Sequence, residues 1–244
     1  MANNGLENEP LAIFKYFTDW WAYLRGPKMF LANQNLSSAE TFSRSSKILA
    51  GGTTAAIALA TVNLKFSPYV GDEQAHELLT ARATGIALVL GCVFYAAIAH
   101  VIALVLRGNG NWRQTYVTFA FTFGFLWPVS AFVLIVNVLF IKLVTGLSWT
   151  ALPPFDVPIA SALERTTGNI IAVAFSATIF LWLIGFLVYC YGCAIWAAHR
   201  ISVMRISVAL IVAMVAINVK PVVSVLYWIS EKFEPLIGWT MERF

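Results

Sequence analysis

The chain has 244 residues, of which 59% are hydrophobic and only 11% are charged. An ordinary soluble domain carries about 25% charged residues, and one soluble core cannot bury this much apolar surface without leaving large patches in water. The composition therefore predicts an all-α integral membrane protein, and it argues against disorder, collagen and a disulfide scaffold. The net charge of +4 is explained by the lysines and arginines that orient membrane segments, so we expect no nucleic-acid partner.

An amphipathic helix is predicted near the N-terminus. Apolar side chains recur there at near-helical spacing, with charged residues between them and further aromatic rings beside them, including Trp20 and Trp21. This composition is typical of a helix that lies in the lipid headgroup layer, and we expect the two tryptophans to be contact residues. Gly26-Pro27 should end the helix. The S-x-x-E spacing from Ser37 to Glu40 predicts a capping box at the start of the next helix.

Five segments with few or no charges follow, at about 47–64, 83–106, 115–141, 169–197 and 203–226. A helix needs roughly 20 residues to cross about 30 Å of hydrocarbon. We therefore predict about five transmembrane helices within a domain at 46–229, preceded by an N-terminal region at 1–45 and followed by an amphipathic tail at 230–244. Pro128 and Pro221 should kink the third and fifth spans. Lys220 interrupts the fifth, so four spans plus an interfacial C-terminus is the alternative.

The distribution of basic residues predicts the orientation. With the N-terminus inside, the inner segments 1–47, 107–113 and 200–205 carry nine basic and four acidic residues, whereas the other side carries seven and eight. The two short inner loops hold arginines and no acid, which is where the positive-inside rule applies best. We therefore expect a cytoplasmic N-terminus. We also expect contacts with partners at these loops, through Trp112, Arg113, Arg200 and Arg205.

Few residues indicate chemistry inside the membrane. Between their flanking charges the first four spans contain no Asp, Glu, Lys or Arg, which disfavours an ion-coupled transporter. His100 and His199 are candidate ligands for a haem or a pigment. Helical rise, however, would place His100 about 10 Å deeper than His199, so we expect no shared cofactor and a bond from His100 to a neighbouring helix.

The remaining candidates have plain structural interpretations. Cys190 and Cys193 lie one helical turn apart, and without a second cysteine pair we expect them to pack rather than to relay electrons. The motifs of common hydrolases, nucleotide-binding proteins and metalloenzymes are absent. We therefore predict a non-enzymatic protein with no cofactor and no metal. Small residues at four-residue spacing, as in Ala120 and Gly124, predict close helix contacts.

Three stretches resemble the Yip-domain family, whose members were first defined as interactors of Rab-type GTPases. These are GNGNWRQT at 108–115, leading into a span with Trp127-Pro128, WAAHRISVMR at 196–205, and LRGPKMF at 24–30. The resemblance covers most of residues 24–219 and implies five spans with a cytoplasmic N-terminus. The D-L-Y-G-P and G-Y-x-x-x-P signatures of eukaryotic members are missing, which points to the prokaryotic members and to a plasma (inner) membrane. The family supplies no catalytic residue.

These observations lead to one functional hypothesis and two alternatives. The chain is expected to act through protein–protein or protein–lipid contacts, as a Yip-like membrane protein that binds lipids and other membrane subunits or a second copy of itself. One alternative is an accessory subunit of a large respiratory or photosynthetic membrane complex. The other is a channel or passive transporter, for which Thr118, Thr122 and Asn137 would be the nearest approach to a polar stripe.

Overall fold

The computed structural model describes residues 9–66, 81–145 and 167–217. Within them the chain forms helices and no strand, which confirms the all-α prediction. The helices are α1 (Glu9–Arg25), α2 (Pro27–Ala32), α3 (Ala39–Phe66), α5 (Ala81–Val105), α6 (Trp112–Thr145), α8 (Thr167–His199) and α9 (Val203–Ile217). The predicted kink at Pro221 and the predicted tail at 230–244 lie outside the described residues.

Three helices are long and apolar enough to cross a membrane. They contain the segments Leu88–Val105, Trp112–Asn137 and Ala174–His199, which match the second, third and fourth predicted spans. The first predicted span falls on α3, whose early turns are polar. The fifth falls on α9, whose apolar part Val203–Val212 is shorter than a membrane span. The chain is therefore a helical membrane protein with three candidate spans, and the count of five stays a prediction.

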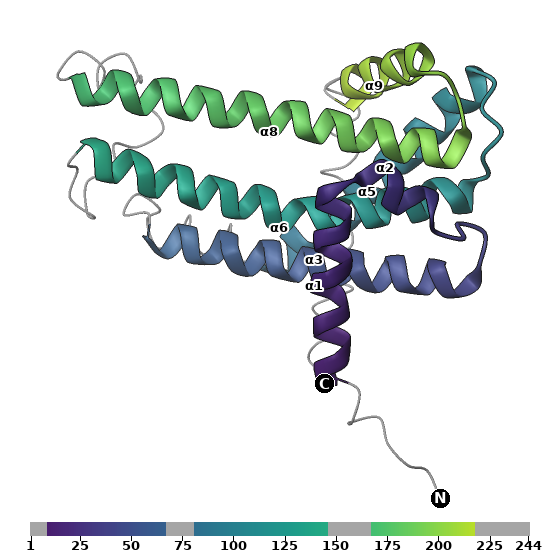
Figure 1. Cartoon of the computed structure of the whole chain (residues 1–244), viewed down its shortest axis with the longest axis horizontal. Helices are drawn as coiled ribbons and strands as arrows, with labels where there is room; N and C mark the ends of the chain where they lie inside the picture. The colour runs from purple at the N-terminus through teal and green to yellow at the C-terminus, as the bar shows by residue number, and fades with distance from the viewer. Residues whose placement is uncertain (1–8, 67–80, 146–166, 218–244) are drawn as a thin grey trace, which may run out of the picture.

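The long helices α3, α6 and α8 run side by side along the longest dimension of the molecule (Figure 1). α6 lies at the centre, because it packs extensively against both α3 and α8 and also contacts α5. The helix α1 runs across this bundle instead of along it, and its N-terminal turns project past the edge (Figure 1). We call the end of the bundle that holds the connections 106–111 and 200–202 the turn end.

Two glycines let α3 and α6 touch through their backbones. A Cβ atom added to Gly52 would lie 1.9 Å from the carbonyl oxygen of Gly124, and one added to Gly124 would lie 2.6 Å from the carbonyl oxygen of Ile48. Any larger residue would hold the two helices apart. The predicted small-residue contact at Ala120 and Gly124 is confirmed, since both residues are buried. Its glycine partner on α3 was not predicted.

The helix boundaries follow from local sequence chemistry. As predicted, α1 ends before Gly26 and α2 begins at Pro27, because proline suits the first helical position and cannot continue a preceding helix. The predicted cap at Ser37 is wrong by one residue. The hydroxyl of Ser38 accepts the bond from the Thr41 backbone N–H at 3.0 Å, and α3 begins directly after Ser38.

The core is concentrated in the first half of α6. Every residue from Val117 to Leu126 is buried, and four of them are phenylalanines. Beyond this stretch α6 continues through Pro128 without a break, and large apolar side chains such as Phe132 become exposed. The turn-end half of α6 is therefore enclosed by other helices. The far half presents apolar side chains outward, as a lipid-facing helix does.

Candidate functional site

One face of α1 is fixed to the middle of α6 by three aromatic side chains. The hydroxyl of Tyr16 donates to the carbonyl oxygen of Gly124 at 3.1 Å, and the indole N–H of Trp20 donates to that of Phe125 at 3.1 Å. The hydroxyl of Tyr23, which is completely buried, donates to the Thr122 hydroxyl at 3.0 Å. Aromatic rings with a polar atom bury apolar area and satisfy a hydrogen bond together. These contacts determine which face of α1 looks inward.

The opposite face of α1 carries large exposed side chains. Phe14, Phe17 and Trp21 are 71%, 58% and 52% exposed, and the Arg25 guanidinium lies 4.9 Å from the Trp21 ring centroid. We call these four residues the α1 outer surface. Of the two tryptophans predicted to make contacts, Trp21 therefore belongs to this surface. Trp20 is half-buried and braces the helix internally.

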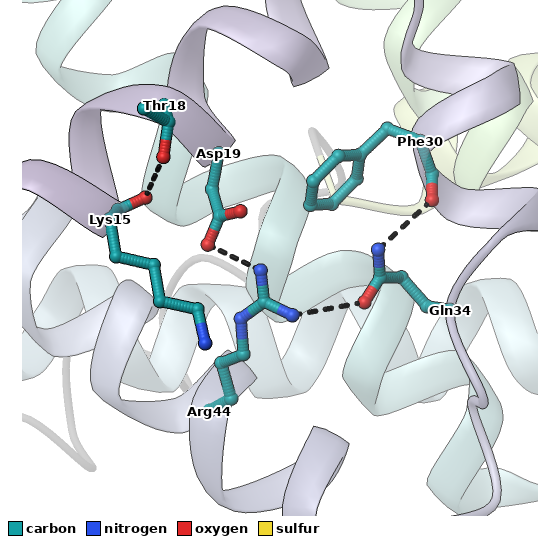
Figure 2. A network of polar contacts seen from close by, with 6 residues as sticks. All are labelled: Lys15, Thr18, Asp19, Phe30, Gln34 and Arg44. Carbon is teal, nitrogen blue, oxygen red and sulfur yellow. Dashed lines mark hydrogen bonds and ion pairs between the residues drawn. The ribbon is translucent and has the colours of Figure 1, made fainter.

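A polar network holds α1, the connection after α2, and α3 together. The Arg44 guanidinium forms an ion pair with Asp19 and donates to the Gln34 side-chain oxygen at 3.3 Å, as Figure 2 shows. The amide of Gln34 donates in turn to the carbonyl oxygen of Phe30 at 3.3 Å. The ion pair is partly shielded, with side-chain exposures of 30% for Arg44 and 18% for Asp19. One cation therefore links three segments that are distant in sequence.

The two candidate histidines lie together at the turn end, which corrects the prediction that they sit at different depths. His100 Nδ1 and His199 Nε2 are 3.4 Å apart, and each lies within 3.0 Å of the Thr115 hydroxyl oxygen. That hydroxyl also donates to the carbonyl oxygen of Asn111 at 3.2 Å. The expected bond from His100 to a neighbouring helix is present, because Thr115 belongs to α6.

The contacts of Thr115 indicate a structural role for this cluster. Its hydroxyl oxygen lies within hydrogen-bond distance of a histidine of α5, a histidine of α8 and the carbonyl oxygen of Asn111. His199 Nδ1 is buried without a partner among the described residues. The cluster therefore joins α5, α6 and α8.

Glycines of the connection 106–111 make room for this packing. A Cβ atom on Gly108 would lie 2.8 Å from His199 Nδ1, and one on Gly110 would lie 2.2 Å from the carbonyl oxygen of Ala198. The backbone N–H of Asn109 donates to the carbonyl oxygen of His199 at 3.2 Å. The connection thus folds against the end of α8, which brings the two histidines to one level.

The other predicted contact residues also lie near the turn end, in different settings. Trp112 is 41% exposed and packs edge-on against His100. The Arg113 guanidinium lies 5.4 Å from the Phe42 ring centroid, and its Nε is buried without a hydrogen-bond partner among the described residues. Arg205 donates to the carbonyl oxygen of Leu106 at 3.2 Å, which ties α9 to the end of α5.

The described residues form no metal-binding cluster, and their cysteines are unpaired. Nowhere in these three ranges do three or more His, Cys, Asp or Glu side chains gather at metal-binding distance. Cys92, Cys190 and Cys193 are free and buried.

The three residues considered for a polar stripe are all bonded within the protein. Thr118 and Thr122 each donate to a carbonyl oxygen of α6 itself, at 2.9 and 2.8 Å. Asn137 accepts a bond from the Ser176 hydroxyl at 2.9 Å.

Sequence reasoning missed several residues of these sites. The sequence pattern predicts aromatic rings beside the first helix but does not distinguish Tyr16 and Tyr23 among them, and it does not indicate Asn109, Gln114 or Gln34. Asn111 and Gln114 exchange side-chain and backbone bonds at 2.9 and 3.0 Å. Their N-x-x-Q spacing is a capping-box pattern, which could have predicted the start of α6.

Comparison of the chain with family models, curated proteins and solved structures finds no match. The resemblance to the Yip-domain family therefore stays a prediction.

Proposed function

We propose that this chain is a non-enzymatic membrane protein that acts by contact with the lipid surface, and that the α1 outer surface is the contact. The observation that carries the proposal is the crossing of α1 over the spanning helices (Figure 1), together with the exposure of Phe14, Phe17 and Trp21. A helix that lies in the plane of a bilayer typically buries such rings at the boundary between headgroups and acyl chains.

Helix lengths support this placement. α6 has 34 residues, so at about 1.5 Å per residue it extends roughly 51 Å, which exceeds the hydrocarbon thickness of about 30 Å by about 20 Å. The α1 contact at Gly124 lies 12 residues after the start of α6 at Trp112, or about 18 Å along the helix. If the excess length projects at the turn end, α1 lies at the membrane surface.

The charges of α3 favour the turn end as the projecting end. Glu40, Arg44 and Lys47 all precede Gly51, where α3 passes beside Tyr16 of α1. From Ile48 onward α3 has no charged residue until Lys65. The polar turns therefore lie on the turn-end side of α1, and the apolar turns lie on the far side. Under this proposal the turn end stands in water, and the charge distribution favours the cytoplasm.

The charge of α1 favours acidic lipids. Lys15 and Arg25 are exposed on this helix. Of its two carboxylates, Asp19 is neutralised by Arg44, so with Glu9 counted the helix keeps one net positive charge. Tryptophan beside arginine suits a headgroup layer, because the ring enters the apolar boundary while the guanidinium reaches phosphate.

Depth measurement in vesicles tests the proposal. A spin label at position 21 (Trp21→Cys) is expected to be accessible to oxygen and protected from a water-soluble nickel complex. A label at the exposed position 47 (Lys47→Cys) is expected to show the reverse. The three native cysteines are buried and should resist labelling in the folded protein. Equal exposure of both labels to the nickel complex would refute an in-plane helix.

A paired substitution separates lipid contact from folding. Trp21→Ala is expected to weaken retention of phosphatidylglycerol by the purified protein several-fold while leaving its thermal midpoint unchanged. Trp20→Phe, which removes an internal hydrogen bond, should lower the midpoint and leave lipid retention intact. If the protein instead purifies within a complex of several hundred kilodaltons and Trp21→Ala releases it, the surface binds protein, and lipid contact is refuted.

A further inference from the structure

A polar cavity of about 290 Å³ opens at the turn end. It lies between the connection after α2, the start of α6 and the end of α8. The polar residues that line it are Gln34, Asn35, Ser37, Asn109, Gln114, His199 and Arg200. They comprise four side-chain amides, one hydroxyl, one imidazole and one arginine, with no carboxylate in the described lining. The amides and the hydroxyl can donate hydrogen bonds, and the arginine attracts negative charge.

Arg200 occupies a backbone position that normally belongs to glycine. Its φ is 54°, and its N–H bonds to the carbonyl oxygen of Trp196 at 2.8 Å, which closes the end of α8 in a left-handed cap. Glycine is the usual residue there, because a side chain at positive φ is strained. The chain thus keeps an arginine where a glycine would fold more easily.

The Arg200 guanidinium is held by stacking rather than by hydrogen bonds. Its guanidinium lies 4.5 Å from the Trp196 ring centroid, and the Lys28 ammonium lies 4.6 Å from the same ring. Stacking of this kind orients the planar group without occupying its N–H donors. Among the described residues, none accepts a hydrogen bond from that guanidinium. Within the described part of the chain, its five donors are therefore without an acceptor.

We infer that this cavity binds an anionic phosphate group, with Arg200 as its charged ligand and the side-chain amides as neutral donors. A planar guanidinium matches two phosphate oxygens, and Lys28 adds a second positive charge beside Trp196. The volume is small compared with common ligand pockets of about 300–1,000 Å³. It admits a phosphate group with one small substituent. The phosphate could come from a lipid headgroup or from a soluble phosphate ester.

The test uses the full chain and three variants. Arg200→Gln removes the guanidinium, and Arg107→Gln is the matched control. Arg107 also has a positive φ, of 65°, and also follows a helix end, but it does not line the cavity. Binding is measured by native mass spectrometry with phosphatidic acid against phosphatidylcholine, and by calorimetry with inorganic phosphate and glycerol 3-phosphate.

Retention of phosphatidic acid by the wild type and by Arg107→Gln, with at least tenfold weaker retention by Arg200→Gln, would support a lipid headgroup as the source. Binding of the soluble phosphates with the same dependence on Arg200 would support a soluble source. Failure of the wild type to bind any of the phosphates, or equal binding by Arg200→Gln, would overturn the inference. Neither result depends on whether α1 contacts lipid, since α1 does not line the cavity.

A third variant distinguishes binding from a structural role. Arg200→Gly removes the strained side chain, so it is expected to raise the thermal midpoint while abolishing phosphate binding. A lower midpoint with binding retained would show that Arg200 serves the fold through its contact with Trp196, and the inference would fail.

Discussion

The contact between Gly52 and Gly124 provides a strong test of the fold. In Gly52→Ala the new Cβ atom would lie 1.9 Å from the carbonyl oxygen of Gly124, whereas an ordinary contact begins at 3.4 Å. The obstructing atom belongs to a helix backbone and cannot rotate away. α3 and α6 must therefore separate by about 1.5 Å at this point, which is the difference between those two distances.

The cost can be worked out from packing. Overfilling a tight site costs about 1–3 kcal/mol, and rigid backbone on both sides places this site at the upper end. A radial gap of about 1 Å also forfeits a quarter to a half of the dispersion attraction around it. Replacing a helical glycine by alanine stabilises the helix by about 1 kcal/mol. We expect a net loss of about 2 kcal/mol, or a fall in thermal midpoint of about 4–8 °C for a chain of this size.

The matched control is the same substitution at Gly185 on α8. There a Cβ atom meets nothing within 4 Å, so only the helix propensity changes, and Gly185→Ala should raise the midpoint by about 2 °C. The thermal midpoint of both variants is measured in the same mild detergent. Unfolding is monitored as the loss of the monodisperse peak in size-exclusion chromatography. If Gly52→Ala is as stable as Gly185→Ala, the close approach of α3 and α6 is wrong.

Two further predictions concern the attachment of α1. Burial raises the pKa of the Tyr23 hydroxyl well above its ordinary value of 10.0, so the folded chain keeps a proton that the unfolded chain loses. Stability should therefore decrease as pH rises above about 10. Tyr23→Phe loses the bond to Thr122, so it should be about 1 kcal/mol less stable near neutral pH. Its thermal midpoint should decrease less steeply than that of the wild type between about pH 9 and 11. Parallel pH profiles of the two midpoints would contradict this. For the ion pair, a double-mutant cycle of Asp19→Asn and Arg44→Gln should give a coupling of about 0.5–1 kcal/mol that shrinks in high salt; a coupling near zero in low salt would count against it.

Periodicity predicts that a helix is amphipathic, but it cannot decide which of two aromatic faces points inward. Trp20 and Trp21 are adjacent, so they differ by about 100° around the axis of α1. Both have aromatic neighbours at helical spacing. The choice depends on hydrogen-bond acceptors that only the tertiary structure brings near, namely carbonyl oxygens of α6. The end of α1 at Gly26-Pro27 depends on local chemistry alone, and there the prediction is correct.

The misplacement of His100 has a similar origin. Helical rise from the nearest charged residue gives the correct depth of His100 only if the connections extend outward from the helices. Instead, the connection 106–111 turns back, and its glycines pack against the last turn of α8. Glycines in a connection permit such a close approach, so GNGN at 108–111 carried the relevant signal, although it did not identify the partner. Depth along a helix equals depth in the protein only when connections do not fold back. The pairing of His100 with His199 therefore depends on the absence of a Cβ atom at Gly110.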